Sequence, residues 1–101
     1  MEKSTFTPLY EKFRKSLVSL REKAGMTQRD LTKKLGREHS FVSRIELGER
    51  RLDVVEFFWI LTACGQDPAK TAASVMKDFT QLEGEDKSRT VYKRKRPGAK
   101  A

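Results

Sequence analysis

Three polar residues of different kinds lie close together near the middle of the chain, namely His39, Ser40 and Arg44. The apolar residues Phe41 and Ile45 among them are four positions apart, which is the spacing of one face of a helix. If that apolar face is buried, Ser40 and Arg44 point away from the protein. An outward arginine can donate two hydrogen bonds to O6 and N7 of a guanine, and serine can bond several bases. The pattern therefore predicts a helix whose outward side chains are suited to contact base edges in DNA.

Two short helices are predicted around these residues, over positions 27–35 and 38–47. Thr27 and Asp30 have the spacing of a capping box at the start of the first helix, and Gly36 lies in the tight turn after it. Two helices joined in this way form a helix-turn-helix, whose second helix fits a major groove about 12 Å wide. Helix pairs also occur in all-α proteins that bind no DNA, so the outward residues carry the functional argument.

Caps and apolar periodicity predict three further helices and one compact all-α domain of five helices over residues 1–83. The first helix begins at Pro8, after a cap at Thr7, and ends at Gly25. The fourth begins after Asp53, and the fifth begins at Pro68. The expected core positions of the fourth helix are Val54, Phe57, Phe58, Ile60, Leu61 and Cys64.

The chain has 101 residues, enough for one domain, and 22 Lys or Arg against 14 Asp or Glu give a net charge of +8. Residues 80–101 carry half of that net charge and include the basic run at 93–96. Because residues 84–101 have few apolar side chains, we predict that they form a disordered basic tail. The tail is either an arm that contacts nucleic acid phosphates or a solubilising segment.

Several classes of function are disfavoured by composition. One Cys and one His cannot supply a disulfide framework or a structural zinc site, so we expect no metal or other cofactor. No Gly-rich phosphate loop or nucleophile elbow is present, so we do not expect an enzyme. The apolar run at 54–64 is too short to cross a membrane, and the N-terminus lacks a secretory signal. We therefore expect a cytoplasmic, nucleoid-associated protein.

The stretches MTQRDL (residues 26–31), KLG (34–36) and VSRIELGERR (42–51) resemble the helix-turn-helix of the Cro and lambda-repressor type, the XRE family. The resemblance covers about residues 13–70. It implies a lambda-repressor-like domain in which the helix at 38–47 enters the major groove of double-stranded DNA. The chain departs from the usual family pattern at Thr32, where alanine is common.

The resemblance also implies roles for individual residues. Arg21 and Glu46 match a partly buried ion pair that ties the first helix to the recognition helix. The expected base contacts are His39, Ser40, Ser43 and Arg44. The expected phosphate contacts are Gln28, Arg37, Arg50 and Arg51.

Val55 and Trp59 lie four positions apart, on the side of the fourth helix that the family leaves polar. An exposed Trp beside a Val indicates a contact surface. The partner is either the fifth helix of the same chain or a second copy in a homodimer, and both alternatives stay open.

Together these features predict a sequence-specific transcriptional regulator, a repressor that binds an inverted-repeat operator as a homodimer. One alternative is the DNA-binding antitoxin of a toxin–antitoxin pair. The other is a bridging module on the same fold that contacts a protein partner, such as transcription machinery, and reads no bases.

Overall fold

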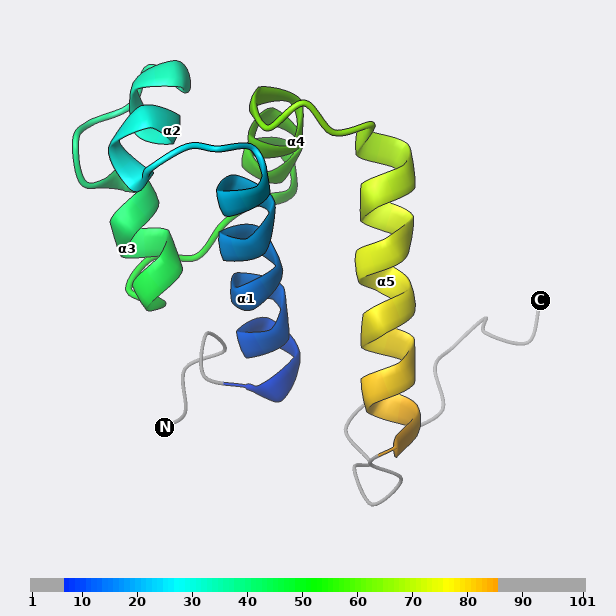
Figure 1. Ribbon diagram of the computed structural model, residues 1–101. Coiled ribbons are helices and arrows are strands. Elements are labelled where there is room, and N and C mark those ends of the chain that lie inside the picture. Colours follow the sequence, from blue (N-terminus) through cyan, green and yellow to red (C-terminus); the bar gives the residue numbers. More distant parts are fainter. Residues whose placement is uncertain (1–6, 86–101) are drawn as a thin grey trace.

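The computed structural model describes residues 7–85, and within them the chain forms five helices and no strand. The helices are α1 (Pro8–Lys23), α2 (Gln28–Lys34), α3 (Phe41–Leu47), α4 (Val54–Ala63) and α5 (Pro68–Glu85). α1 and α5 lie side by side and run in opposite directions, and α2 and α3 lie on the other side of α1 (Figure 1). The predicted all-α fold is confirmed. Most of the predicted basic tail, residues 86–101, lies outside the described residues.

Side-chain caps start the helices where the sequence pattern placed them. The Thr7 hydroxyl accepts a hydrogen bond from the first turn of α1 at 3.2 Å. Thr27 with Asp30, and Asp53 with Glu56, form complete capping boxes at the starts of α2 and α4. Each box satisfies two backbone N–H groups that the helix itself leaves without partners.

The start of α3 differs from the prediction, because the helix begins at Phe41 and not near position 38. The preceding residues form a turn, and Ser40 occupies the N-cap position without a side-chain hydrogen bond to the helix. A buried hydroxyl from α2 supplies that contact, since Thr32 Oγ1 accepts from the backbone N–H of Val42 at 3.3 Å. The departure from the family alanine at Thr32 therefore gives α3 a cap from a neighbouring helix.

The core lies where all five helices meet. Phe13 of α1 is its aromatic centre, with ring contacts to Tyr10, Phe57 and Phe79 at centroid distances of 5.4, 5.0 and 6.3 Å. The buried apolar residues are Phe13, Leu17, Leu31, Phe41, Val42, Ile45, Phe57, Ile60, Leu61, Cys64 and Val75. The face of α3 that carries Phe41 and Ile45 is therefore buried, as the sequence predicted.

Two of the predicted core positions of α4 are wrong. Val54 is 77% exposed and Phe58 is 52% exposed, whereas Phe57, Ile60 and Leu61 are buried. The apolar positions of α4 extend around most of the helix, but its neighbours α2 and α5 cover only part of that circumference. Periodicity cannot show which part of an all-round apolar helix is covered.

The C-terminal end of α3 depends on a glycine. Gly48 has a φ of +83°, and a Cβ atom there would lie 3.2 Å from Nε of Arg14. The Arg14 side chain crosses this end of the helix, where its Nη1 donates to the backbone carbonyl of Glu46 at 2.7 Å. A cation at the C-terminal end of a helix also interacts favourably with the helix dipole.

We predict that Gly48→Ala destabilises the domain more than Gly36→Ala. Both glycines have left-handed φ values, which cost an L-residue about 1–2 kcal/mol. A Cβ at Gly36 meets nothing within 4 Å, whereas one at Gly48 displaces Arg14. Urea unfolding of the two variants measures the difference, and equal losses of unfolding free energy would contradict the role of Arg14.

Candidate nucleic-acid interface

The outward face of α3 is accessible and lies beside α2, on the side of the molecule away from α5 (Figure 1). Arg44 and Leu47 on this face are exposed, and Ser43 is half-buried. The opposite face of the same helix is fully buried. A seven-residue helix held in this way presents one fixed row of side chains to a partner.

The four residues expected to contact bases come together on this surface. His39 and Ser40 lie in the turn that leads into α3, and the Ser43 hydroxyl donates to the carbonyl of Ser40 at 3.1 Å. Nη1 of Arg44 is 3.9 Å from a carboxylate oxygen of Glu38, and both side chains are exposed. A surface ion pair of this kind contributes little to stability, so the Arg44 guanidinium is available to another partner.

The Arg21–Glu46 ion pair is present and joins α1 to α3. Nε and Nη2 of Arg21 donate to the two carboxylate oxygens of Glu46 at 2.7 and 3.1 Å, and Nη1 donates to the carbonyl of Met26 at 2.9 Å. The hydrogen bonds to Glu46 raise the pKa of the Arg21 guanidinium above its ordinary value. Because both side chains are nearly buried, the pair fixes the orientation of α3.

Gln28, expected at a phosphate, also contacts Glu46. Its Nε2 donates to Oε1 of Glu46 at 2.7 Å, so this carboxylate accepts from side chains of both α1 and α2. The amide nitrogen of Gln28 carries a second N–H, and the residue is exposed. One donor of Gln28 thus holds α3 in place, and the other remains for a ligand.

The Arg50 guanidinium is bound within the protein. Nη1 and Nη2 donate to the two carboxylate oxygens of Glu56 at 3.0 and 2.9 Å, and Nη1 also donates to the carbonyl of Arg51 at 2.8 Å. Glu56 is buried, so its charge needs this partner. Arg50 therefore has a structural role, and its expected phosphate contact stays a prediction. Arg51 is exposed and forms no ion pair within residues 7–85.

Arg37 joins the same cluster from the turn before α3. Its guanidinium carbon lies 4.2 Å from the ring centroid of Phe41, and that of Arg50 lies 4.9 Å from it. Nη1 of Arg37 is 3.6 Å from a carboxylate oxygen of Glu56. Glu56, Arg37, Arg50 and Phe41, here called the Glu56 cluster, therefore connect the start of α4 to the start of α3.

The hydrogen bonds from Arg50 lower the pKa of the Glu56 carboxyl below its ordinary value, against the opposite effect of burial.

The sequence analysis missed two residues of this site. The capping pattern assigns Glu56 only to a helix cap, and none of the sequence motifs includes Arg14. A sequence signal existed for both. Glu56 is the one charged residue between Val54 and Ala63, and Arg14 lies two helical turns before Arg21.

Other chemistry in the described part of the chain is limited. Residues 7–85 include no helix long and apolar enough to span a bilayer, and no group of three or more metal-binding side chains. Cys64 is a free thiol, and burial raises its pKa, which keeps it protonated and unreactive. The cysteine therefore has the character of a core residue.

Comparisons with known proteins agree with this arrangement. Residues 16–73 match a family model described as a helix-turn-helix domain. The chain is similar to a solved XRE-family like protein from Pseudomonas syringae pv. tomato str. DC3000, with 38% sequence identity and a TM-score of 0.64. That match covers 69% of this chain and 88% of the other. None of the curated proteins matches the chain.

We predict that Glu46→Ala lowers the unfolding free energy by about 3 kcal/mol, because it leaves Arg21 nearly buried without its carboxylate. Glu49→Ala, at an exposed position just after α3, is the control and is expected to change stability little. Thermal and urea unfolding measure both variants. A wild-type melting temperature for Glu46→Ala, combined with an altered DNA sequence preference, would overturn the structural role.

The stability of the domain should depend on pH through Glu56. Because the folded pKa of Glu56 is lowered, the stability that its charge provides is complete above the ordinary glutamate pKa of about 4.3 and declines as pH falls through the folded value. Glu56→Gln should cost about 2 kcal/mol at neutral pH, and the difference from wild type should shrink below about pH 4. Urea unfolding over a pH series measures this difference, and a constant difference would contradict it.

Proposed function

The chain belongs to the XRE-type helix-turn-helix family, and on that premise we propose that it is a sequence-specific transcriptional regulator. The proposed mode is repression, with a homodimer bound to an inverted-repeat operator. Such a protein acts on the chromosome, which places it in the cytoplasm with the nucleoid. The accessible outward face of α3, held rigidly by Glu46, is the observation that carries the proposal.

Base reading is assigned to the residues on that face. Arg44 can donate both ends of its guanidinium to a guanine, and the exposed Leu47 can contact the methyl group of a thymine. Ser43, Ser40 and His39 extend the same surface toward the preceding turn. The buried opposite face and the ion pair to α1 support this role because they prevent α3 from turning in the groove.

Phosphate contacts are assigned to residues on both sides of α3. Gln28 retains one amide N–H, Arg51 is exposed in the loop after α3, and Arg37 keeps part of its guanidinium exposed in the turn before it. Contacts of this kind position the recognition helix on the duplex and carry no sequence information themselves. Arg50 is left out because Glu56 binds it.

The short length of α3 supports a homodimer. α3 has seven residues and is about 10 Å long at 1.5 Å per residue, which spans about three base pairs of DNA. Sites of that length occur too often in a genome to be distinguished. Two copies on an inverted repeat double the number of bases read. Repression is the simplest outcome, since occupation of a promoter requires no further contact.

Selection of bound sequences from a random pool of DNA duplexes tests this function. We expect enrichment of an inverted repeat with half-sites about one helical turn apart. No enrichment would contradict base reading and would favour the bridging module that binds DNA without sequence preference.

On the selected operator, Arg44→Ala should relax discrimination at one position of each half-site by about 1–3 kcal/mol. Arg51→Ala should weaken binding to all sequences alike and reduce the slope of log K against log salt by about 0.9 for each phosphate that is no longer neutralised. Lys70→Ala, on the exposed side of α5, is the control. Equal effects of Arg44→Ala on all sequences would contradict its assignment to a base.

A further inference from the structure

The outer face of α4 is apolar, exposed and without charge. Val55, Phe58 and Trp59 are each about half exposed, at 51%, 52% and 49%, and Thr62 continues the same strip. Charged residues make up 36% of the chain, and the single charge within α4, Glu56, points inward. An apolar strip along the whole of a short helix indicates a surface that another molecule covers.

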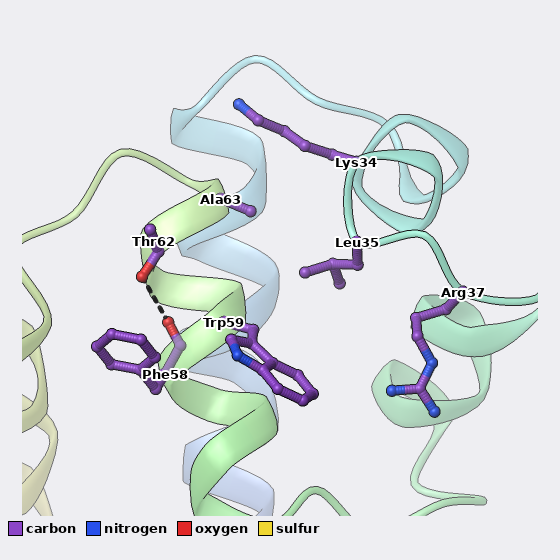
Figure 2. A pocket seen from close by; sticks show the side chains of 7 residues that line it. All are labelled: Lys34, Leu35, Arg37, Phe58, Trp59, Thr62 and Ala63. Carbon is purple, nitrogen blue, oxygen red and sulfur yellow. Dashed lines mark hydrogen bonds between the residues drawn. The ribbon is translucent and has the colours of Figure 1, made fainter.

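A groove of about 570 Å³ runs along one flank of this strip. Figure 2 shows Trp59 directed across it toward Leu35 and Arg37, while Phe58 points to the other flank of α4. Lys34 lies at the upper end of the groove, beside Ala63. The groove therefore has an apolar wall from α4 and a basic rim from α2 and the following turn.

α5 does not cover this surface, which removes the alternative that Trp59 packs against the fifth helix. None of the residues that line the groove belongs to α5. Met76 and Phe79 of α5 instead line a second groove, together with Val54 and Phe57 of α4. Within residues 7–85, about half of the surface of Val55, Phe58 and Trp59 is thus left uncovered.

We infer that a second copy of this chain covers the strip, with the two α4 helices antiparallel across a two-fold axis near Phe58 and Trp59. The inference rests on the proposed homodimer and names its contact surface. At a two-fold axis each residue meets its own counterpart, so a charge at the centre would meet a like charge. The uncharged centre of α4 satisfies that condition.

The pairing also matches charges at the ends of the helices. α4 is ten residues and about 15 Å long, so an antiparallel pair centred on Phe58 and Trp59 brings Val55 opposite Thr62 of the partner subunit. Lys34, beside Ala63 at one end, then lies near the start of α4 of the partner subunit, where the Asp53 carboxylate caps that helix. Lys34 has no ion pair within the described residues, whereas Arg37 on the same rim is held by Glu56.

This arrangement leaves the outward face of α3 free, and Arg37 alone of the residues assigned to DNA lines the groove. Val55, Phe58, Trp59 and Thr62 all belong to α4, and none of them contributes to the outward face of α3. A foreign partner with several acidic groups would fit less well, because Lys34 is the one cation on the rim without an internal ion pair in residues 7–85. The self-complementary strip therefore favours a second copy.

The chain contains a single tryptophan, so Trp59 reports directly on this surface. We expect sedimentation equilibrium to show a dimer that dissociates on dilution, and Trp59 emission to shift to longer wavelength over the same concentrations. Val55→Asp should raise the dimer dissociation constant at least about tenfold, because it buries an unpaired carboxylate opposite Thr62 of the partner subunit in an apolar contact. Lys34→Glu, which opposes Asp53 of the partner subunit, should weaken the dimer by a smaller factor.

Met76→Asp is the matched control, since Met76 is 52% exposed and lies on α5. It should leave the dimer intact, and circular dichroism should show that all variants remain folded. The inference is overturned if the wild-type chain is monomeric at every concentration, if Met76→Asp dissociates the dimer and Val55→Asp does not, or if dimerisation leaves Trp59 emission unchanged.

DNA binding separates this inference from the proposed function. Val55→Asp should still bind an isolated half-site as tightly as the wild-type chain, and should lose affinity for the full inverted repeat. Failure of the wild-type chain to bind any selected DNA would contradict the proposed function, while sedimentation would still decide the contact surface.

Discussion

The carboxylate of Glu46 is the interaction on which the rest of the site depends. It accepts hydrogen bonds from Arg21 of α1 and from Gln28 at the start of α2, and the backbone carbonyl of the same residue accepts from Arg14. α3 has only seven residues, too few for a stable isolated helix. Its direction is therefore set by neighbours, and charge-assisted hydrogen bonds are directional enough to set it. A recognition surface can be specific only when its helix is held in this way.

A second buried carboxylate, that of Glu56, holds the other end of α3 in place. Glu56 binds Arg50 and lies near Arg37, and both guanidinium groups lie over the ring of Phe41, the first residue of the helix. The basic residues of the domain thus divide into two groups. Some are neutralised by buried carboxylates and shape the site, and others, such as Arg44, remain accessible. Net charge alone does not separate these groups, because both count equally toward it.

α4 connects the reading surface to the proposed dimer. Its inner face carries Glu56 and core residues, and its outer face carries Val55 and Trp59. One helix therefore fixes the loop after the recognition helix on one side and offers an uncharged strip on the other. In the proposed dimer, the spacing of two recognition helices would be transmitted through this rigid element, since α4 packs on both α2 and α5. A rigid helix between two sites fixes their separation more accurately than a loop does.

The sequence by itself determined the five helices, the caps of every helix but α3, and the family, because capping boxes and apolar periodicity are local and act within a few residues. It placed Arg44 on an outward face for the same reason. Only the tertiary structure decided that Arg50 binds Glu56, that Thr32 caps α3 and that Phe58 is exposed. Each of these depends on which side chains from distant positions meet, and on how much of an apolar helix its neighbours cover. Periodicity shows which way a side chain points from its own helix. Which residue it meets there depends on how the helices pack.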